Sequence, residues 1–128
     1  MSLKSKVLIF MGLFEGIEEF QKYTNVEYTK DGDSVPSKFE EDFGLEYYCR
    51  DLVEKKFIES TSDIELLLKD FSYSDSFQKN DLKITQEYNG VMLIYDFEDT
   101  IDVATISKNA PMNFVGEIDY EKIIENKW

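Results

Sequence analysis

The chain has 128 residues, with 27 acidic side chains against 14 basic ones and no histidine, so its formal net charge at neutral pH is -13. The lack of histidine excludes histidine-dependent catalytic triads and histidine-ligated zinc, and the negative charge argues against nucleic acid or an anionic membrane as a direct ligand. Aromatic residues make up 15% of the chain, which is too many for a disordered protein, and we predict one folded domain over residues 1–128.

The first marked feature along the chain is the apolar run "KVLIFMGLF", residues 6–14. It is shorter than the roughly 18 residues that a membrane helix needs and too close to the start for the core of a signal peptide, so we expect a cytoplasmic protein. Its length and continuous apolar character predict a central strand that is buried on both faces. Gly12 inside the run indicates a bulge or a close approach of another backbone.

Residues 15–33 predict a helix, a strand and a turn in that order. In "EGIEEFQKYT", residues 15–24, the apolar positions recur at helical spacing and three glutamates lie near the start, where the helix dipole favours negative charge. The following "VEYT" predicts a strand. Residues 30–33, Lys-Asp-Gly-Asp, have the composition of a turn.

A short helix and a strand are predicted next. Pro36 suits the first turn of a helix, with Phe39 and Phe43 on one of its sides and Gly44 as its C-terminal cap. A strand is favoured around residues 52–58.

Two more helices are predicted after residue 60. Ser62 and Glu65 have the spacing of a capping box ahead of an apolar pattern with helical period, and Ser72 or Ser74 is predicted to cap another short helix that carries Phe77. The aromatic side chains with helix-like spacing are predicted to be core residues: Phe39, Phe43, Phe57, Phe71 and Phe77.

The last part of the chain predicts strands followed by a helix. "GVMLIYDF", residues 90–97, repeats the apolar pattern of the first strand, residues 113–118 predict another strand with Gly116 as a bulge position, and residues 101–106 predict a strand between them. Asp119 is predicted to cap a final helix that places Tyr120 on an apolar face.

The mixture of strands and helices has no strict alternation, which predicts an α+β single domain. We expect a mostly antiparallel sheet of about four to five strands with several short helices. A doubly wound parallel sheet is the less favoured alternative.

The acidic segment "YTKDGDSVPSKFEEDFG", residues 28–44, was compared with two kinds of chemical site. Aligned on a calcium-binding EF-hand from Asp31, it places Val35 where the loop needs an oxygen ligand and Pro36 where it needs glycine, so that interpretation fails. Consecutive acids on a short surface helix, all solvated, give no reason to single out a catalytic pair. Nucleotide-binding glycine motifs are absent as well. We expect no metal, no cofactor and no catalytic residue.

Three stretches taken together resemble a known protein family: "GLFEGIEEFQKYTNVEYTKDGDSVPSKFEEDFGLEYYCRDLVEKKF", "LLLKDFSYSDSF" and "YNGVMLIYDFE". In this order they are similar to the bacterial immunity protein 22 family. The resemblance implies a cytoplasmic antidote, encoded beside a polymorphic toxin, that binds the cognate toxin domain and neutralises it. It implies no particular binding surface.

The binding surface is therefore predicted from charge and chemistry. Clustered acids raise the rate of encounter with a basic partner, and exposed tyrosines beside acids are typical of interface hot spots. The predicted partner-binding residues are Asp31, Asp33, Glu40, Glu41, Asp42, Glu46, Tyr47, Tyr48 and Asp51.

A toxin domain with a basic cleft, such as a nuclease, is the partner that this surface suits. Three alternatives remain open from the sequence. The acids can serve solubility alone, the chain can be a small carboxylate-metal-dependent enzyme, or it can be an acidic protein-binding adaptor unrelated to toxins.

Overall fold

The centre of the protein is a four-stranded antiparallel sheet with the strand order β4-β5-β1-β6. In this computed structural model, which describes residues 2–45, 48, 50–97, 101 and 106–123, the strands are β1 (Ser2–Gly12), β4 (Val53–Thr61), β5 (Tyr88–Tyr95) and β6 (Met112–Ile123). The prediction of an α+β domain with a mostly antiparallel sheet is confirmed.

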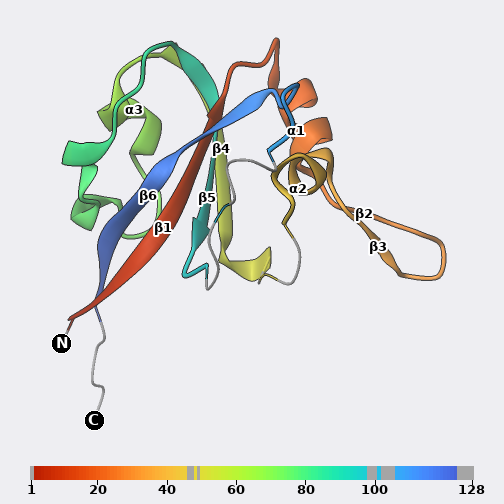
Figure 1. The fold of residues 1–128 in the computed structure, drawn as a ribbon, viewed down its shortest axis with the longest axis horizontal. Coiled ribbons are helices and arrows are strands. Elements are labelled where there is room, and N and C mark those ends of the chain that lie inside the picture. Colours follow the sequence, from red (N-terminus) through yellow and green to blue (C-terminus); the bar gives the residue numbers. More distant parts are fainter. Residues whose placement is uncertain (1, 46–47, 49, 98–100, 102–105, 124–128) are drawn as a thin grey trace.

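Helices and turns cover both faces of this sheet (Figure 1). One face carries α1 (Ile17–Thr24) and α2 (Lys38–Phe43), and the other carries α3 (Ile64–Leu68) together with short 3-10 turns at Ser74–Ser76 and Lys79–Asp81. A third 3-10 turn, Arg50–Leu52, leads into β4. The strands β2 (Glu27–Tyr28) and β3 (Ser34–Val35) form a separate two-stranded sheet.

Because both faces of the sheet are covered, the sheet separates two apolar clusters. Val7, Ile9 and Met11 of β1 face the cluster under α3, whereas Leu8 and Phe10 face the cluster under α1 and α2. All eight residues of β5 are buried. This arrangement is the physical reason why residues 7–11 of β1 and 91–95 of β5 are apolar without alternation, and it confirms both predicted central strands.

The C-terminal helix predicted from Asp119 onward is wrong, because β6 continues as a strand to Ile123. The predicted bulge at Gly116 is confirmed: Ile9 pairs with Gly116 while Phe10 pairs with Phe114, so one extra residue stands in β6. An extra residue reverses which face the following side chains occupy. Phe114 therefore packs under α1 and α2, whereas Ile118 and Tyr120 pack under α3.

The start of α3 differs from its prediction. Its N-cap is Asp63, whose side chain accepts a hydrogen bond from the backbone of Glu65, so Ser62 caps nothing. The helix predicted to carry Phe77 is only the 3-10 turn Ser74–Ser76, which has no side-chain cap.

Other local predictions have mixed outcomes. The α1 helix, the strand around residues 52–58 and the C-cap at Gly44 are confirmed, as is the close approach at Gly12, where an added Cβ would lie 2.8 Å from the Pro111 carbonyl oxygen. The strand predicted for residues 101–106 falls largely outside the described residues. None of the helices in the described part of the chain combines the length and apolar character that crossing a membrane requires.

Candidate partner-binding surface

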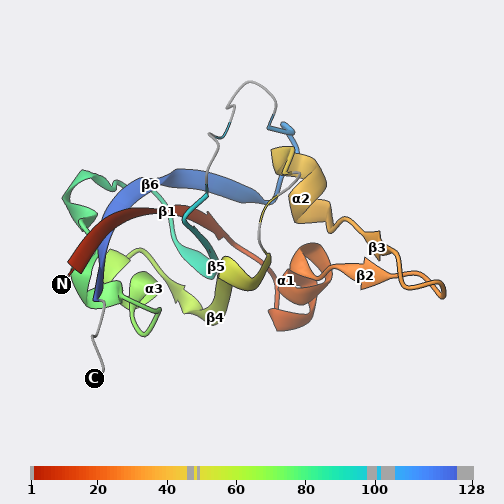
Figure 2. The same cartoon turned by 90° about the horizontal axis from the view of Figure 1, so that it is seen from below.

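The acidic segment consists of two parts with opposite surroundings. Its first part is the hairpin arm, residues 27–35, formed by β2, a turn and β3. Its second part is α2. Figures 1 and 2 show the arm extending away from the main sheet, whereas α2 lies against it.

Every residue from 27 to 36 is exposed, so the hairpin arm has no core of its own. Its turn is ordered by backbone hydrogen bonds from the Thr29 amide to the Asp33 carbonyl, 2.8 Å, and from the Gly32 amide to the Thr29 carbonyl, 3.0 Å. Gly32 has a φ of 87°, which glycine adopts without strain. The predicted turn is confirmed, but Ser34 and Val35 are strand residues and do not lead directly into the helix.

The N-cap of α2 is Ser37, which forms a capping box, so Pro36 precedes the cap and its predicted place in the first turn is wrong. The Ser37 hydroxyl accepts from the Glu40 amide, 3.0 Å, and the Glu40 carboxylate accepts from the Ser37 amide, 2.9 Å. Phe39 and Phe43 each lie with a ring centroid 4.9 Å from that of Phe10 in β1. These two aromatic contacts fix α2 to the sheet.

Glu40 was predicted to be solvated, and this prediction is wrong because its side chain is 2% exposed. Besides the Ser37 amide, the Glu40 carboxylate accepts hydrogen bonds from the Tyr48 hydroxyl, 2.6 Å, and from two nitrogens of Arg50, 3.0 and 3.1 Å. Burial by itself would raise the pKa of Glu40, but the hydrogen bonds from Arg50, Tyr48 and Ser37 outweigh it and hold the pKa below its ordinary value.

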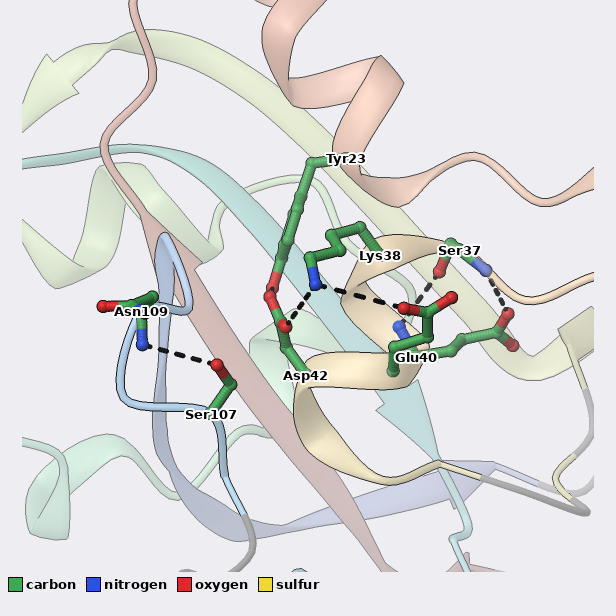
Figure 3. A network of polar contacts seen from close by, with 8 residues as sticks. Tyr23, Ser37, Lys38, Glu40, Asp42, Ser107 and Asn109 are labelled. Carbon is green, nitrogen blue, oxygen red and sulfur yellow. Dashed lines mark hydrogen bonds and ion pairs between the residues drawn. The ribbon is translucent and has the colours of Figure 1, made fainter.

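Asp42 was also predicted to be solvated, and this prediction is wrong because its side chain is 4% exposed. Its carboxylate accepts a hydrogen bond from the Tyr23 hydroxyl of α1, 2.9 Å, and forms an ion pair with Lys38 one helical turn earlier, 3.3 Å (Figure 3). Its carbonyl oxygen accepts from the Ser107 amide, 2.9 Å. Burial, and then the hydrogen bond to Asp42, raise the pKa of Tyr23.

Two cations near the start of β4 hold the two ends of the hairpin arm. Before the arm, the Lys55 ammonium donates to the Thr24 hydroxyl, 3.0 Å, and to the Asn25 side chain. After the arm, Arg50 binds Glu40, whose carboxylate also binds the Ser37 amide. We call Lys55, Arg50 and Glu40 the arm clamp.

The remaining predicted site residues lie at the surface or outside the described residues. Asp31, Asp33, Glu41 and Asp51 are exposed, and Tyr48 is half-buried with its hydroxyl turned to Glu40. Glu46 and Tyr47 lie outside the described residues. The structure thus brings Tyr48 and Glu40 together, holds Asp42 in a separate set of contacts with Tyr23 and Lys38, and leaves the four exposed acids toward solvent.

Sequence reasoning missed the residues that bury these acids. The capping-box spacing of Ser37 and Glu40 in "SKFE" predicts that the Glu40 carboxylate turns back to the Ser37 amide. Lys38 and Asp42 have the spacing of an intrahelical ion pair. No local pattern identifies the other two partners, Tyr23 and Arg50, because they come from other elements.

No observation favours catalytic or metal chemistry at this surface. Among the described residues, no group of three or more Asp, Glu or Cys side chains could hold a metal ion. The two buried carboxylates already bind cationic and hydroxyl groups of the chain, so their charges serve to position α2.

The comparisons with known proteins gave one match. The model of a protein family described as Immunity protein 22 matches residues 7–121, which is most of the chain. No curated protein and no solved structure matches the chain.

Proposed function

The chain belongs to the immunity protein 22 family, and we propose from this that it is a non-catalytic antidote that binds a cognate toxin domain and neutralises it. The family match carries the proposal. The carboxylates of Asp42 and Glu40 bind side chains inside the fold, so they are not free to act on a substrate. This supports a non-catalytic protein. Such an antidote acts where the toxin acts, which we propose to be the cytoplasm.

The charge of the chain supports a basic partner. A net charge of -13 produces a negative field that attracts a positively charged protein and raises its association rate, by about ten- to a thousandfold at low ionic strength. A nuclease domain is a candidate of this kind because its cleft must bind phosphates.

The exposed acids of the predicted set are the proposed contacts: Asp31, Asp33, Glu41 and Asp51. Glu46, Tyr47 and the half-buried Tyr48 are kept as predictions. Glu40 and Asp42 are no longer proposed as contacts, because a carboxylate inside the fold cannot reach a partner without breaking α2 from the sheet.

The test combines protection with binding. The toxin domain encoded beside the gene for this chain is expressed in bacteria with and without the chain. Cells that express the toxin domain are expected to grow only when they also express the chain. Purified chain is then mixed with a catalytically inactive form of that domain over a range of sodium chloride concentrations, and the association rate is expected to fall as salt rises.

Failure of the chain to restore growth, together with no detectable binding, would contradict the proposed function. Binding with a rate that is independent of salt would retain the antidote and reject the electrostatic part.

A further inference from the structure

We propose that the hairpin arm is the element that docks, entering a concave, positively charged cleft of the toxin domain with Tyr28 buried at the contact. This inference rests on the proposed function and names the part of the surface that acts in it.

The arm carries two large hydrophobic side chains that the described chain covers only in part. Tyr28 is 67% exposed and Val35 is 40% exposed, although both stand on regular strands where side chains ordinarily pack against a core. Tyrosine is among the residues most enriched at binding hot spots, because it offers a large rigid surface with a polar end. Tyr28 has the exposure and setting of such a residue.

The arm clamp fixes the chain on both sides of the hairpin arm. An isolated two-stranded hairpin is marginally stable in water, and β2 pairs with β3 through only two residue pairs. Lys55 fixes the chain before β2 and Glu40 with Arg50 fixes it after β3. A pre-positioned element loses less conformational entropy on binding than a free loop.

The shape and charge of the arm decide which partner it suits. The arm extends from the body in both views (Figures 1 and 2), so its complement is a concave surface. It has three carboxylates, Glu27, Asp31 and Asp33, against the single cation Lys30, so the complement is positively charged. A second copy of this chain is disfavoured as occupant because each copy has a net charge of -13.

The first experiment measures binding kinetics of full-length variants with the inactive toxin domain. Tyr28→Ala is expected to raise Kd about 30-fold, mainly through faster dissociation, as loss of a hot-spot residue does. The double variant Asp31→Asn/Asp33→Asn is expected to lower the association rate at least about threefold at low salt, as a part of the overall electrostatic steering.

Matched controls lie elsewhere on the surface. Leu66→Ala removes an apolar side chain that is 49% exposed on α3, at the opposite side of the sheet, and Glu59→Gln/Glu87→Gln removes two exposed charges outside the arm. Leu66→Ala is expected to bind as the parent does, and the charge control to slow association less than the arm variant. Thermal unfolding of each variant verifies that it is folded.

The second experiment reports burial directly. A tryptophan placed by Tyr28→Trp, in a chain whose single native tryptophan is replaced by Trp128→Phe, is expected to shift its emission to shorter wavelength and to lose acrylamide quenching on binding. The emission spectrum of the complex formed by Tyr28→Phe in the same Trp128→Phe background is subtracted, which removes the signal of the toxin domain. An unchanged emission would place Tyr28 outside the contact and overturn the insertion.

The outcomes separate the two levels of the proposal. If the parent binds and protects while the arm variants match their controls, the arm is not the docking element and only this inference fails. If Tyr28→Ala abolishes self-association of the chain in ultracentrifugation and leaves toxin binding unchanged, the occupant is a second copy and the inference is overturned. If the parent neither binds nor protects, the proposed function itself fails.

Discussion

Glu40 shows how a single side chain can have the composition of a binding residue and the position of a structural one. Glu40 and Glu41 are adjacent acids on the same short helix, and only Glu40 has the capping-box spacing to Ser37. The two differ in direction: Glu40 turns inward to Arg50 and Tyr48, whereas Glu41 stays at the surface with Lys38 4.0 Å away. The buried carboxylate joins α2 to the segment that precedes β4.

Glu40→Gln is expected to lower the free energy of unfolding by about 2 kcal/mol, because charge-assisted hydrogen bonds to Arg50 are replaced by weaker neutral ones in a buried place. Chemical denaturation measures the change. Glu41→Gln, with the same chemistry at an exposed position, is expected to change stability by less than about 0.5 kcal/mol. Equal effects of both substitutions would contradict the structural role of Glu40.

The same carboxylate predicts a pH dependence of stability. The pKa values of Glu40, Glu54 and Asp96 lie below their ordinary values, since burial opposes ionisation but hydrogen bonds from Arg50, Ser72 and Lys122, respectively, outweigh it. A lowered pKa in the folded state stabilises the protein above the unfolded-state pKa, and this stability is lost as pH falls through the folded-state value. We therefore expect the free energy of unfolding to decrease from about pH 5 downward. Denaturant titrations at several pH values measure this slope, which Glu40→Gln should reduce; an unchanged slope would exclude Glu40 as a contributor.

At the scale of elements, local sequence predicted strands best where both faces are buried. The apolar runs of β1 and β5 have one interpretation, so their prediction succeeded. In β6 the bulge at Gly116 reverses the facing of side chains midway, so its apolar residues follow no single two-residue period. A helix cap at Asp119 then fitted the pattern equally well, and only pairing with β1 decides for the strand.

Gly12→Ala tests the close contact at the end of β1. The new Cβ would lie 2.8 Å from the Pro111 carbonyl oxygen and 2.8 Å from the Phe14 ring, and the backbone oxygen cannot move without shifting the start of β6. We expect a loss of about 1–3 kcal/mol in unfolding free energy, measured by denaturation. Gly16→Ala, where the Cβ meets no atom within 4 Å, is the control with the smaller expected effect.

At the scale of the whole molecule, the net charge of -13 means that folding brings like charges together. Sodium chloride is expected to raise the melting temperature, because the screening length falls from about 30 Å at 0.01 M to about 8 Å at 0.15 M. Calorimetry at these concentrations measures the shift. Sodium sulfate at equal ionic strength separates screening from the strengthening of apolar burial by sulfate. A melting temperature that is constant in chloride would contradict net repulsion in the fold.

The fold class could be predicted from the sequence, whereas the strand order and the burial of individual acids could not. Strand order depends on which distant strands pair, and apolar runs carry no information on that choice. The predicted exposure of the acids is correct for Asp31, Asp33 and Glu41. It fails for Glu40 and Asp42, because Arg50 and Tyr23 from other elements bind them inside the fold. No local pattern singles out Tyr28, and its place at the surface is evident only from the exposed fraction of its side chain in the folded arm.

The pairing of β1 has a consequence for synthesis in the cell. Val7 pairs with Tyr95 and Ser2 pairs with Ile123, so β1 finds both neighbours only after residues near the other end of the described chain have been made. Contacts of such sequence separation form slowly, and translation proceeds at about 5–20 residues per second. In the proposed role, protection therefore lags behind the start of translation by at least the time needed to complete β6, and a cell that makes the toxin and the proposed antidote together depends on that interval being short.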